Sequence, residues 1–383
     1  MTHKRSPLFP AHRDPKPLPS LGEAAFLLAS GFCFLLVLRN ADAAIAYMGQ
    51  GLTLCARTVI PSLFPFMVVS ELLVASGAGE ALGRLPAGLM RRIFGISGAG
   101  ASALFLGSMC GFPVGARTAA ALLDQGVISK SECEHLLTFT CNPSSAFLIT
   151  AVGVSLYGNR RLGVLLYGVV LACGLLTGLL ARFLMGRCAP TTEHPHYPTG
   201  LRRVGLETFT GAVSTAATGM VTVCAYVVFF SALTGAISCM AEGMGSWGYA
   251  LLCGILEMTG GISEAASLGG ERGLICTAAF AGWSGLSVHC QVMTLCGGRG
   301  ISFKPYLLAK AFQGLLCGGV TAVILRWFPS LTVETEGIIT DAILVFTSMK
   351  DITFPVLLTD GVFLTGWLLS RMRAGLRGAA ERI

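Results

Sequence analysis

The chain has 383 residues, of which 53% are hydrophobic and only 12% are charged, and its formal net charge is +7. Soluble globular proteins carry about 25% charged residues. This composition, with a mean hydropathy of +0.71, therefore excludes an ordinary soluble domain. The basic excess lies at the chain ends and not on a folded polar face, so we expect no nucleic-acid partner.

Long runs without Asp, Glu, Lys or Arg recur along the chain. A helix needs about 20 apolar residues to cross the hydrocarbon core of a bilayer. Runs of that length are residues 93–116, 136–159, 162–181, 208–241 and 273–298. Further apolar candidates are residues 24–38, 59–75, 305–325 and 352–370, of which the last three each contain one charged residue. The alternation typical of a transmembrane barrel is absent. The sequence predicts an all-α, polytopic helical membrane protein with roughly eight to ten spanning or re-entrant helices.

Both ends of the chain are basic. Residues 1–22 form a polar, proline-rich leader, and residues 373–383 form a basic tail. Lys and Arg mark the cytoplasmic flanks of membrane helices, so we expect both termini in the cytoplasm and an even number of crossings. The first apolar run is not followed by the small-residue cleavage site of a signal peptide. These features predict a multi-pass protein of the cell membrane.

The chain divides into two halves that carry similar elements in the same order. A polar connector at residues 191–207 separates an N-terminal half, residues 23–190, from a C-terminal half, residues 208–372. Each half has two interrupted motifs, a basic turn and a long apolar helix. A period near half the chain is typical of duplicated transporters, including those with inverted repeats. We therefore predict two related halves with broken or re-entrant helices.

Four interrupted motifs predict a binding site within the membrane. They are "GFPVGAR" (111–117), "FTCNPSSAFLITAVG" (139–153), "EMTGGISEA" (257–265) and "FAGWSGLSVHCQV" (280–292). Breaks at membrane depth survive only where protein or a wet cavity covers the backbone. Broken helices expose N–H and C=O groups at their ends, and these ends can hold an anion or a polar solute. Discontinuities in matching places of two halves indicate a site near the midplane.

These four motifs, in this order and spacing, resemble the sporulation integral membrane proteins of the YlbJ/SpoVV type. That family carries the nucleoside-recognition or Gate label, and the resemblance covers about residues 52–369. It implies a Gate-like repeat in each half and a place in the outer forespore membrane of a sporulating bacterium. It also implies movement of dipicolinic acid, a small aromatic dicarboxylate. The expected partners are this anion, the lipid bilayer and a second copy or other sporulation membrane proteins.

The candidate solute-binding residues are the polar, glycine and proline positions of the four motifs. They are Gly111, Pro113, Gly115, Arg117, Asn142, Ser144, Ser145, Glu257, Thr259, Gly260, Ser284, Ser287, His289 and Gln291. No Cys-x-x-Cys, Cys/His cluster with metal-ligand spacing, Ser-His-Asp order or phosphate-binding Gly-Lys-Ser loop occurs. We therefore expect no metal, no cofactor and no enzymatic activity.

Two charged candidates carry opposing interpretations. Arg117 can bind a carboxylate through two parallel hydrogen bonds, or it can be an interfacial arginine that extends its charge to water. Glu257 can carry a coupling proton or cation, or pair with Arg117, or form a structural salt bridge. Near Glu71 the prolines at 61 and 65 indicate a re-entrant or gate segment without solute contact.

The neutral candidates also leave alternatives open. Asn142, Ser144 and Ser145 either line the site or hydrogen-bond between helices. Ser287 and Gln291 share one face of a helix, whereas His289 points elsewhere and either relays protons or packs. The function predicted is transport of a small anionic aromatic solute. The alternatives are a transporter of a nucleoside- or nucleobase-like solute, and a membrane scaffold for spore assembly that transports nothing.

Overall fold

The computed structural model describes residues 21–76, 88, 90–186, 205–238, 243 and 245–328, and these residues form helices and connecting turns without a strand. The all-α fold class is thus confirmed. The leader up to residue 20, the connector from 191 to 204, the candidate span at 352–370 and the basic tail lie outside the described residues.

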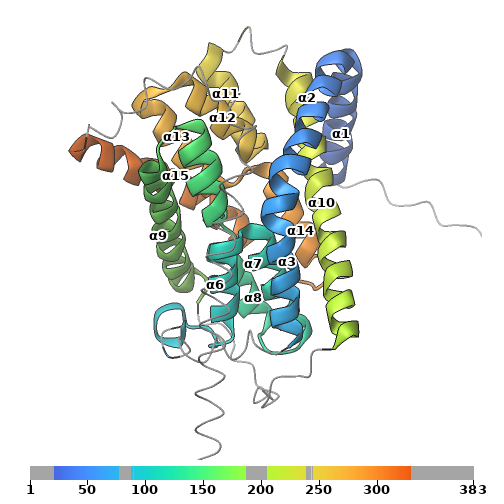
Figure 1. Ribbon diagram of the computed structural model, residues 1–383, viewed down its shortest axis with the longest axis vertical. Helices are drawn as coiled ribbons and strands as arrows, with labels where there is room; N and C mark the ends of the chain where they lie inside the picture. The colour runs from blue at the N-terminus through green and yellow to red at the C-terminus, as the bar shows by residue number, and fades with distance from the viewer. Residues whose placement is uncertain are drawn as a thin grey trace, which may run out of the picture.

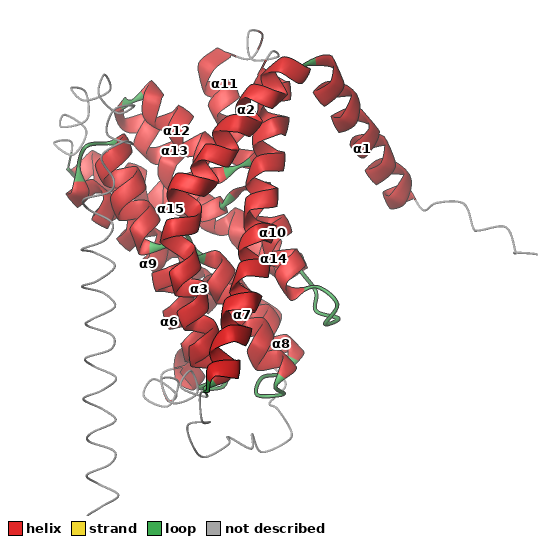
Figure 2. Cartoon of the chain, turned by 45° about the vertical axis from the view of Figure 1, so that its right-hand side comes forward, coloured by secondary structure: helices red, strands yellow, loops and turns green. Residues whose placement is uncertain are grey.

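Four helical segments of the described chain are long and apolar enough to cross a membrane. They are α9 (Arg160–Met185), α10 (Leu206–Ser238), the broken segment Gly270–Cys296 and α15 (Lys304–Trp327). A fifth is possible if α1 (Leu21–Arg39) and α2 (Ala41–Leu54) form one span, bent by 97° between Leu27–Arg39 and Ala41–Arg57. Figure 2 shows α1 leaning away from the body of the molecule. The predicted runs at 162–181 and 208–241 lie mainly in α9 and α10.

Shorter helices fill the space between these long ones. In chain order they are η1 (Cys55–Val59), α3 (Ile60–Ala75), η2 (Met90–Phe94), α6 (Gly100–Cys110), α7 (Phe112–Asp124), α8 (Lys130–Thr140), η3 (Phe147–Leu156), α11 (Gly245–Leu256), α12 (Met258–Leu268), α13 (Gly270–Trp283) and α14 (Gly285–Cys296). In Figure 1, α6, α7 and α8 lie in the lower half of the molecule and α11, α12 and α13 in the upper half, with α9 and α10 on opposite sides.

The segment α6–α7 is a hairpin and not a straight helix. Gly107 and Gly115 are eight positions apart, yet a Cβ atom on Gly107 would lie 3.0 Å from the Cα atom of Gly115. The chain reverses at Gly111, whose φ of 97° favours glycine. The prediction that residues 93–116 form one spanning helix is therefore wrong, because a charge-free run does not reveal a reversal of direction.

The segment α11–α12 is a second hairpin. Gly254 and Gly261 face each other across it, because a Cβ atom on Gly261 would collide with the backbone of Gly254. The turn falls at Glu257, whose extended backbone separates the two helices. Both hairpins thus depend on glycines that allow their two arms to touch.

Two further helical segments are interrupted. Between α8 and η3, residues 141–144 leave the helical conformation, and Pro143 lacks the N–H group that would continue it. Between α13 and α14, Ser284 adopts a left-handed conformation with φ of 74°. A non-glycine residue rarely adopts this conformation, and such residues concentrate at functional sites. Both interruptions fall within motifs that the sequence marked as broken.

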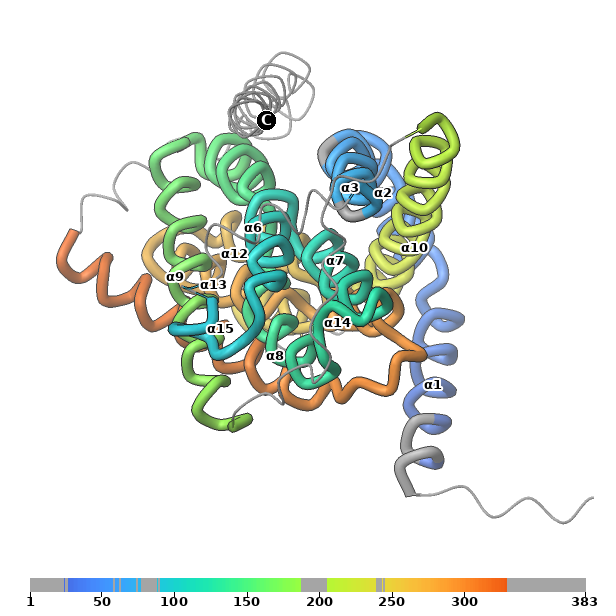
Figure 3. The backbone as a smooth tube through the Cα atoms, turned by 90° about the horizontal axis from the view of Figure 1, so that it is seen from below, coloured from blue at the N-terminus to red at the C-terminus, as the bar shows by residue number. Residues whose placement is uncertain are grey.

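The two halves pack together through apolar clusters and one ion pair near an end of the bundle. The largest cluster combines buried residues of α7 and α8 with others of α14, such as Ala116, Leu136 and Val292. Arg299, in the loop after α14, donates to both carboxylate oxygens of Asp124 at 2.7 Å. This hydrogen bonding raises the pKa of Arg299 above its ordinary value. Figure 3, seen from below, shows α7, α8 and α14 grouped near the centre of the bundle.

Candidate functional site

The tips of both hairpins and parts of both interrupted helices meet at one cavity of about 60 Å³. Its walls come from α2, η1, α3 and α10 and from all four sequence motifs. The lining residues are Leu54, Val59, Leu63, Gly111, Phe112, Pro113, Pro143, Ser144, Phe147, Val223, Val227, Glu257, Met258, Thr259, Val288 and Gln291. Segments that are far apart in the sequence therefore line a single cavity.

Three helix starts lie at this cavity. Helix α7 begins directly after Gly111, and α12 begins directly after Glu257. At the start of the helical segment that leads into η3, the Ser144 hydroxyl accepts a hydrogen bond of 3.1 Å from the Phe147 N–H group. Helix N-termini carry partial positive charge and unpaired N–H groups. Glu257 already caps α12 and Ser144 caps the segment entering η3, whereas α7 has no side-chain cap. The start of α7 is therefore the one best suited to a negatively charged or strongly polar group.

Glu257 is the acidic residue of the cavity wall. Its carboxylate caps α12 and accepts a hydrogen bond of 2.7 Å from the Gly260 N–H group. The side chain is buried, with 7% of the residue exposed. Of the alternatives for this residue, the structure does not show a pairing with Arg117, because the ion pairs among the described residues join Arg117 to Glu71 and Arg299 to Asp124. The carboxylate therefore faces the cavity without a basic partner from that set.

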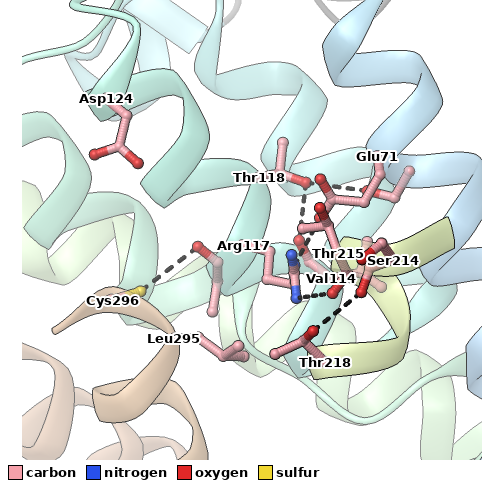
Figure 4. A network of polar contacts seen from close by, with 12 residues as sticks. Glu71, Val114, Arg117, Thr118, Asp124, Ser214, Thr215, Thr218, Leu295 and Cys296 are labelled. Carbon is pink, nitrogen blue, oxygen red and sulfur yellow. Dashed lines mark hydrogen bonds and ion pairs between the residues drawn. The ribbon is translucent and has the colours of Figure 1, made fainter. Parts of the chain in front are cut away.

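Arg117 lies away from the cavity, between α7, α3 and α10. Its Nε atom donates to Glu71 Oε1 at 2.6 Å, and its Nη1 atom donates to the Thr215 carbonyl oxygen at 3.2 Å. Figure 4 shows the guanidinium directed toward Glu71 and the α10 residues. The structure thus gives Arg117 a structural partner, Glu71, which hydropathy could not identify from the sequence.

The polar residues of the interruption after α8 divide between two roles, lining the cavity and hydrogen-bonding between helices. Ser144 lines the cavity, whereas Ser145 donates to the Met109 carbonyl oxygen at 3.3 Å. Asn142 is buried, and its Oδ1 atom accepts from Gln313 Nε2 at 2.8 Å. Asn142 therefore connects helices while its neighbour Ser144 contacts the cavity.

Lys310 and Gln313 bind the segment next to the cavity without lining it, and sequence reasoning missed both. Lys310 Nζ donates to the Cys141 carbonyl oxygen at 3.0 Å, to Asn142 Oδ1 at 3.3 Å and to Gln313 Oε1 at 2.9 Å. Both side chains are fully buried. The signal was a lysine in the middle of the apolar run at 305–325, because ionisable residues at membrane depth are costly and usually functional.

The second interrupted helix contributes Gln291 to the cavity. Its Nε2 atom donates to Ser287 Oγ at 3.2 Å, and its buried Oε1 atom has no hydrogen-bond partner among the described residues. Ser287 and Gln291 therefore share a face, as their spacing indicates. His289 does not line the cavity; its Nδ1 atom lies 3.0 Å from the Tyr306 hydroxyl, and its ring packs edge-on against Trp283.

The remaining candidates support the lining residues. Gly115 packs against the Thr140 carbonyl oxygen. Gly260 donates to Glu257, and Ser284 is buried at the turn between α13 and α14. Among the described residues, no group of three or more His, Cys, Asp or Glu side chains is placed to hold a metal ion.

Fold and site together define a class: a multi-pass helical membrane protein with two helical hairpins and two interrupted helices around a buried cavity. Within that class the chain is 29% identical, over 344 residues, to the sporulation integral membrane protein YlbJ of Bacillus subtilis (strain 168). The match covers 80% of this chain and 83% of that protein. The chain is thus similar to a sporulation integral membrane protein of the YlbJ type, in agreement with the resemblance that its motifs indicated. No protein-family model and no solved structure matches it, so the Gate-like repeats stay a prediction.

Proposed function

We propose that the chain is a carrier that moves a small anionic solute across a membrane during sporulation, and that the solute is dipicolinate. The observation that carries the proposal is the convergence of three helix starts on one cavity between two hairpin tips. The similarity to a sporulation membrane protein supports the setting. The aromatic dicarboxylate is the solute that the family resemblance implies.

The lining of the cavity supports a solute with an aromatic body and charged ends. Phe112, Phe147 and Val288 offer apolar surface, and the start of α7, which no side chain caps, lies in the same wall. Ligand sites commonly combine an apolar lining with a few placed polar groups. Once the cavity widens, a flat ring can pack against these apolar side chains, and a carboxylate is stabilised by the partial positive charge of a helix start.

Transport through this cavity requires the hairpin tips to move apart. A water molecule needs roughly 10–15 Å³ of such volume, so a cavity of about 60 Å³ accommodates a few waters and not an aromatic dicarboxylate. The structure is therefore a closed state of the proposed carrier. Many proteins close loops or helices over a bound ligand and open them again to release it.

The test is uptake of labelled dipicolinate and of a labelled nucleoside by liposomes that contain only the purified chain. Thr259 lines the cavity, so Thr259→Leu places an apolar side chain at the tip of the second hairpin. The matched control is Thr218→Leu on the exposed side of α10. We expect saturable dipicolinate uptake that the first variant abolishes and the second retains. Equal uptake by both variants would contradict the proposed site.

A nucleoside-like solute is the second candidate, and the Gln291 amide favours it. The Oε1 atom of Gln291 has no partner within the described part of the chain and can accept a hydrogen bond, as can the Glu257 carboxylate. A nucleobase supplies N–H donors, whereas the dipicolinate dianion has none. Uptake of the nucleoside without uptake of dipicolinate would select this candidate. Absence of both fluxes from folded protein would favour a scaffold that transports nothing.

A further inference from the structure

Lys310 reaches from α15 in the second half of the chain to the end of α8 in the first half. The residue is 0% exposed. Its ammonium group has three N–H donors, and these have three neutral acceptors: the Cys141 carbonyl, Asn142 Oδ1 and Gln313 Oε1. The hydrogen-bonding capacity of the group is therefore used, while its charge is not neutralised by any of these partners.

The charge of Lys310 is compensated by the end of a helix and not by a carboxylate. Neither of the two ion pairs in the described part of the chain includes this residue. Helix α8 ends at Thr140, and Cys141 is its C-terminal cap. The C-terminal end of a helix carries partial negative charge. The ammonium group thus lies at the negative end of α8, directly before the interruption that contains Pro143.

A second hydrogen-bonded layer fixes the acceptors in place. Gln313 Nε2 donates to Asn142 Oδ1 at 2.8 Å and to the Val170 carbonyl oxygen at 3.1 Å. Gly174 of α9 closes the site from the other side, because a Cβ atom there would lie 3.0 Å from both Asn142 Nδ2 and Gln313 Nε2. The position of Lys310 Nζ is therefore set by α8, α9 and α15 together.

Transporters with interrupted helices commonly use such a place for a coupling ion. Unwound carbonyl groups and the C-terminal ends of half-helices coordinate Na⁺ or a proton, and binding of that ion stabilises the solute site. Here a carbonyl oxygen, two amide oxygens and a helix C-terminus surround the ammonium group of the chain itself. No dissociable cation can occupy the same point while Lys310 is charged.

We propose that Lys310 is a built-in cation, which replaces a dissociable metal ion at the interruption of α8 and positions the Asn142–Ser144 segment at the cavity. The proposal rests on the proposed function only in taking that cavity as the solute site. It assigns Lys310 a positioning role, and it makes the solute site independent of Na⁺. Removing the side chain creates a site for an added cation of similar shape.

Chemical rescue tests this assignment on the purified full-length chain. Lys310→Ala removes three methylene groups and the ammonium, which propylammonium reproduces. We expect its thermal unfolding midpoint to lie below that of the wild type and to rise by about 3 °C with saturating propylammonium chloride. Tetramethylammonium chloride, whose cation has no N–H donor, leaves the midpoint unchanged. The matched control Lys304→Ala, at the exposed start of α15, responds to neither salt. A folded Lys310→Ala variant without this response would overturn the proposal.

Sodium dependence supplies a measurement that does not require Lys310→Ala to fold. The wild type is expected to unfold at the same temperature, and to transport at the same rate, in NaCl and in choline chloride. A specific requirement of the wild type for Na⁺ contradicts the built-in cation. Lys310→Met keeps the length of the side chain without its charge, and we expect this variant to lose uptake; uptake at the wild-type rate contradicts the positioning role.

The two readouts separate this inference from the proposed function. If the wild type transports neither dipicolinate nor a nucleoside, the proposed function fails. The response of the unfolding midpoint to propylammonium still reports on Lys310 in that case, because it depends on cation binding and not on flux.

Discussion

Arg117 Nε lies 2.6 Å from Glu71 Oε1, so this ion pair connects the second arm of the first hairpin to α3. The two side chains are 16% and 22% exposed, so they are largely buried, and a charge that loses its partner there costs more than at an open surface. The position of the pair suits a contact that breaks and re-forms when the hairpin moves. We regard Arg117 as part of a latch between the first hairpin and α3, and not as part of the cavity wall.

The latch interpretation predicts that Arg117→Gln and Glu71→Gln have the same effect. Each variant is expected to change the maximal uptake rate and to leave the apparent affinity for the solute unchanged. It should also lower the free energy of unfolding by about 1–3 kcal/mol, because the remaining charged group is largely buried and loses its partner. The double variant is expected to resemble either single one, because the two groups act as one pair. Loss of apparent affinity in Arg117→Gln alone would indicate that the arginine contacts the solute after all.

Glycine at position 115 is predicted to be essential for the first hairpin. A Cβ atom there would lie 2.5 Å from the Thr140 carbonyl oxygen, which is backbone at the end of α8 and cannot move aside. We expect Gly115→Ala to lower the free energy of unfolding by about 2 kcal/mol, as overpacking does. The control is Gly168→Ala in α9, where nothing lies within 4 Å of the added atom. A loss of stability in Gly168→Ala as large as that in Gly115→Ala would contradict this explanation.

Asn142 is predicted to contribute to stability as well as to the site. Its Oδ1 atom accepts from both Gln313 and Lys310, so Asn142→Ala leaves two buried donors short of an acceptor. Unsatisfied buried groups cost about 1–3 kcal/mol, and more when charged. Thermal unfolding in detergent measures this loss. Ser144→Ala, which removes a hydroxyl that caps the segment entering η3, is expected to be milder; the reverse order contradicts the described network.

The position of Glu257 in the cavity wall predicts that uptake of an anionic solute is coupled to uptake of a proton. An anionic solute and an ionised Glu257 carboxylate in one small cavity repel each other, so the anion and a proton are expected to enter together. Inwardly directed proton gradients should therefore accelerate dipicolinate uptake by the wild type. Glu257→Gln keeps the shape of the side chain without the charge, and its uptake is expected to ignore the gradient. A wild type that also ignores the gradient excludes this coupling.

The sequence predicted the interruptions of the helices because their causes are local. Gly111, Pro143 and the polar residues around Ser284 mark these places without reference to the rest of the chain. The structure places all four motifs at one cavity, which the matching order in the two halves had suggested. The relation of the two halves as repeats, and the orientation of the termini, stay predictions.

The sequence could not predict which side chains pair with each other or where the chain reverses its direction, because both depend on tertiary packing. A break at Gly111 indicates an interruption, but only the contact between Gly107 and Gly115 shows that the chain turns back. The pairing of Arg117 with Glu71 joins residues that hydropathy treats separately. Lys310 was overlooked because a single lysine hardly changes the apolar character of α15, although its burial makes it the most unusual charge of the described chain.

Equilibrium binding of labelled dipicolinate to the purified chain tests the central claim, a solute site at the hairpin tips, most directly. The account predicts saturable binding to the wild type and to Thr218→Leu, and at least about a tenfold weaker binding, equivalent to ~1.4 kcal/mol, to Thr259→Leu. Binding of equal strength to all three proteins would place the solute elsewhere and contradict the account.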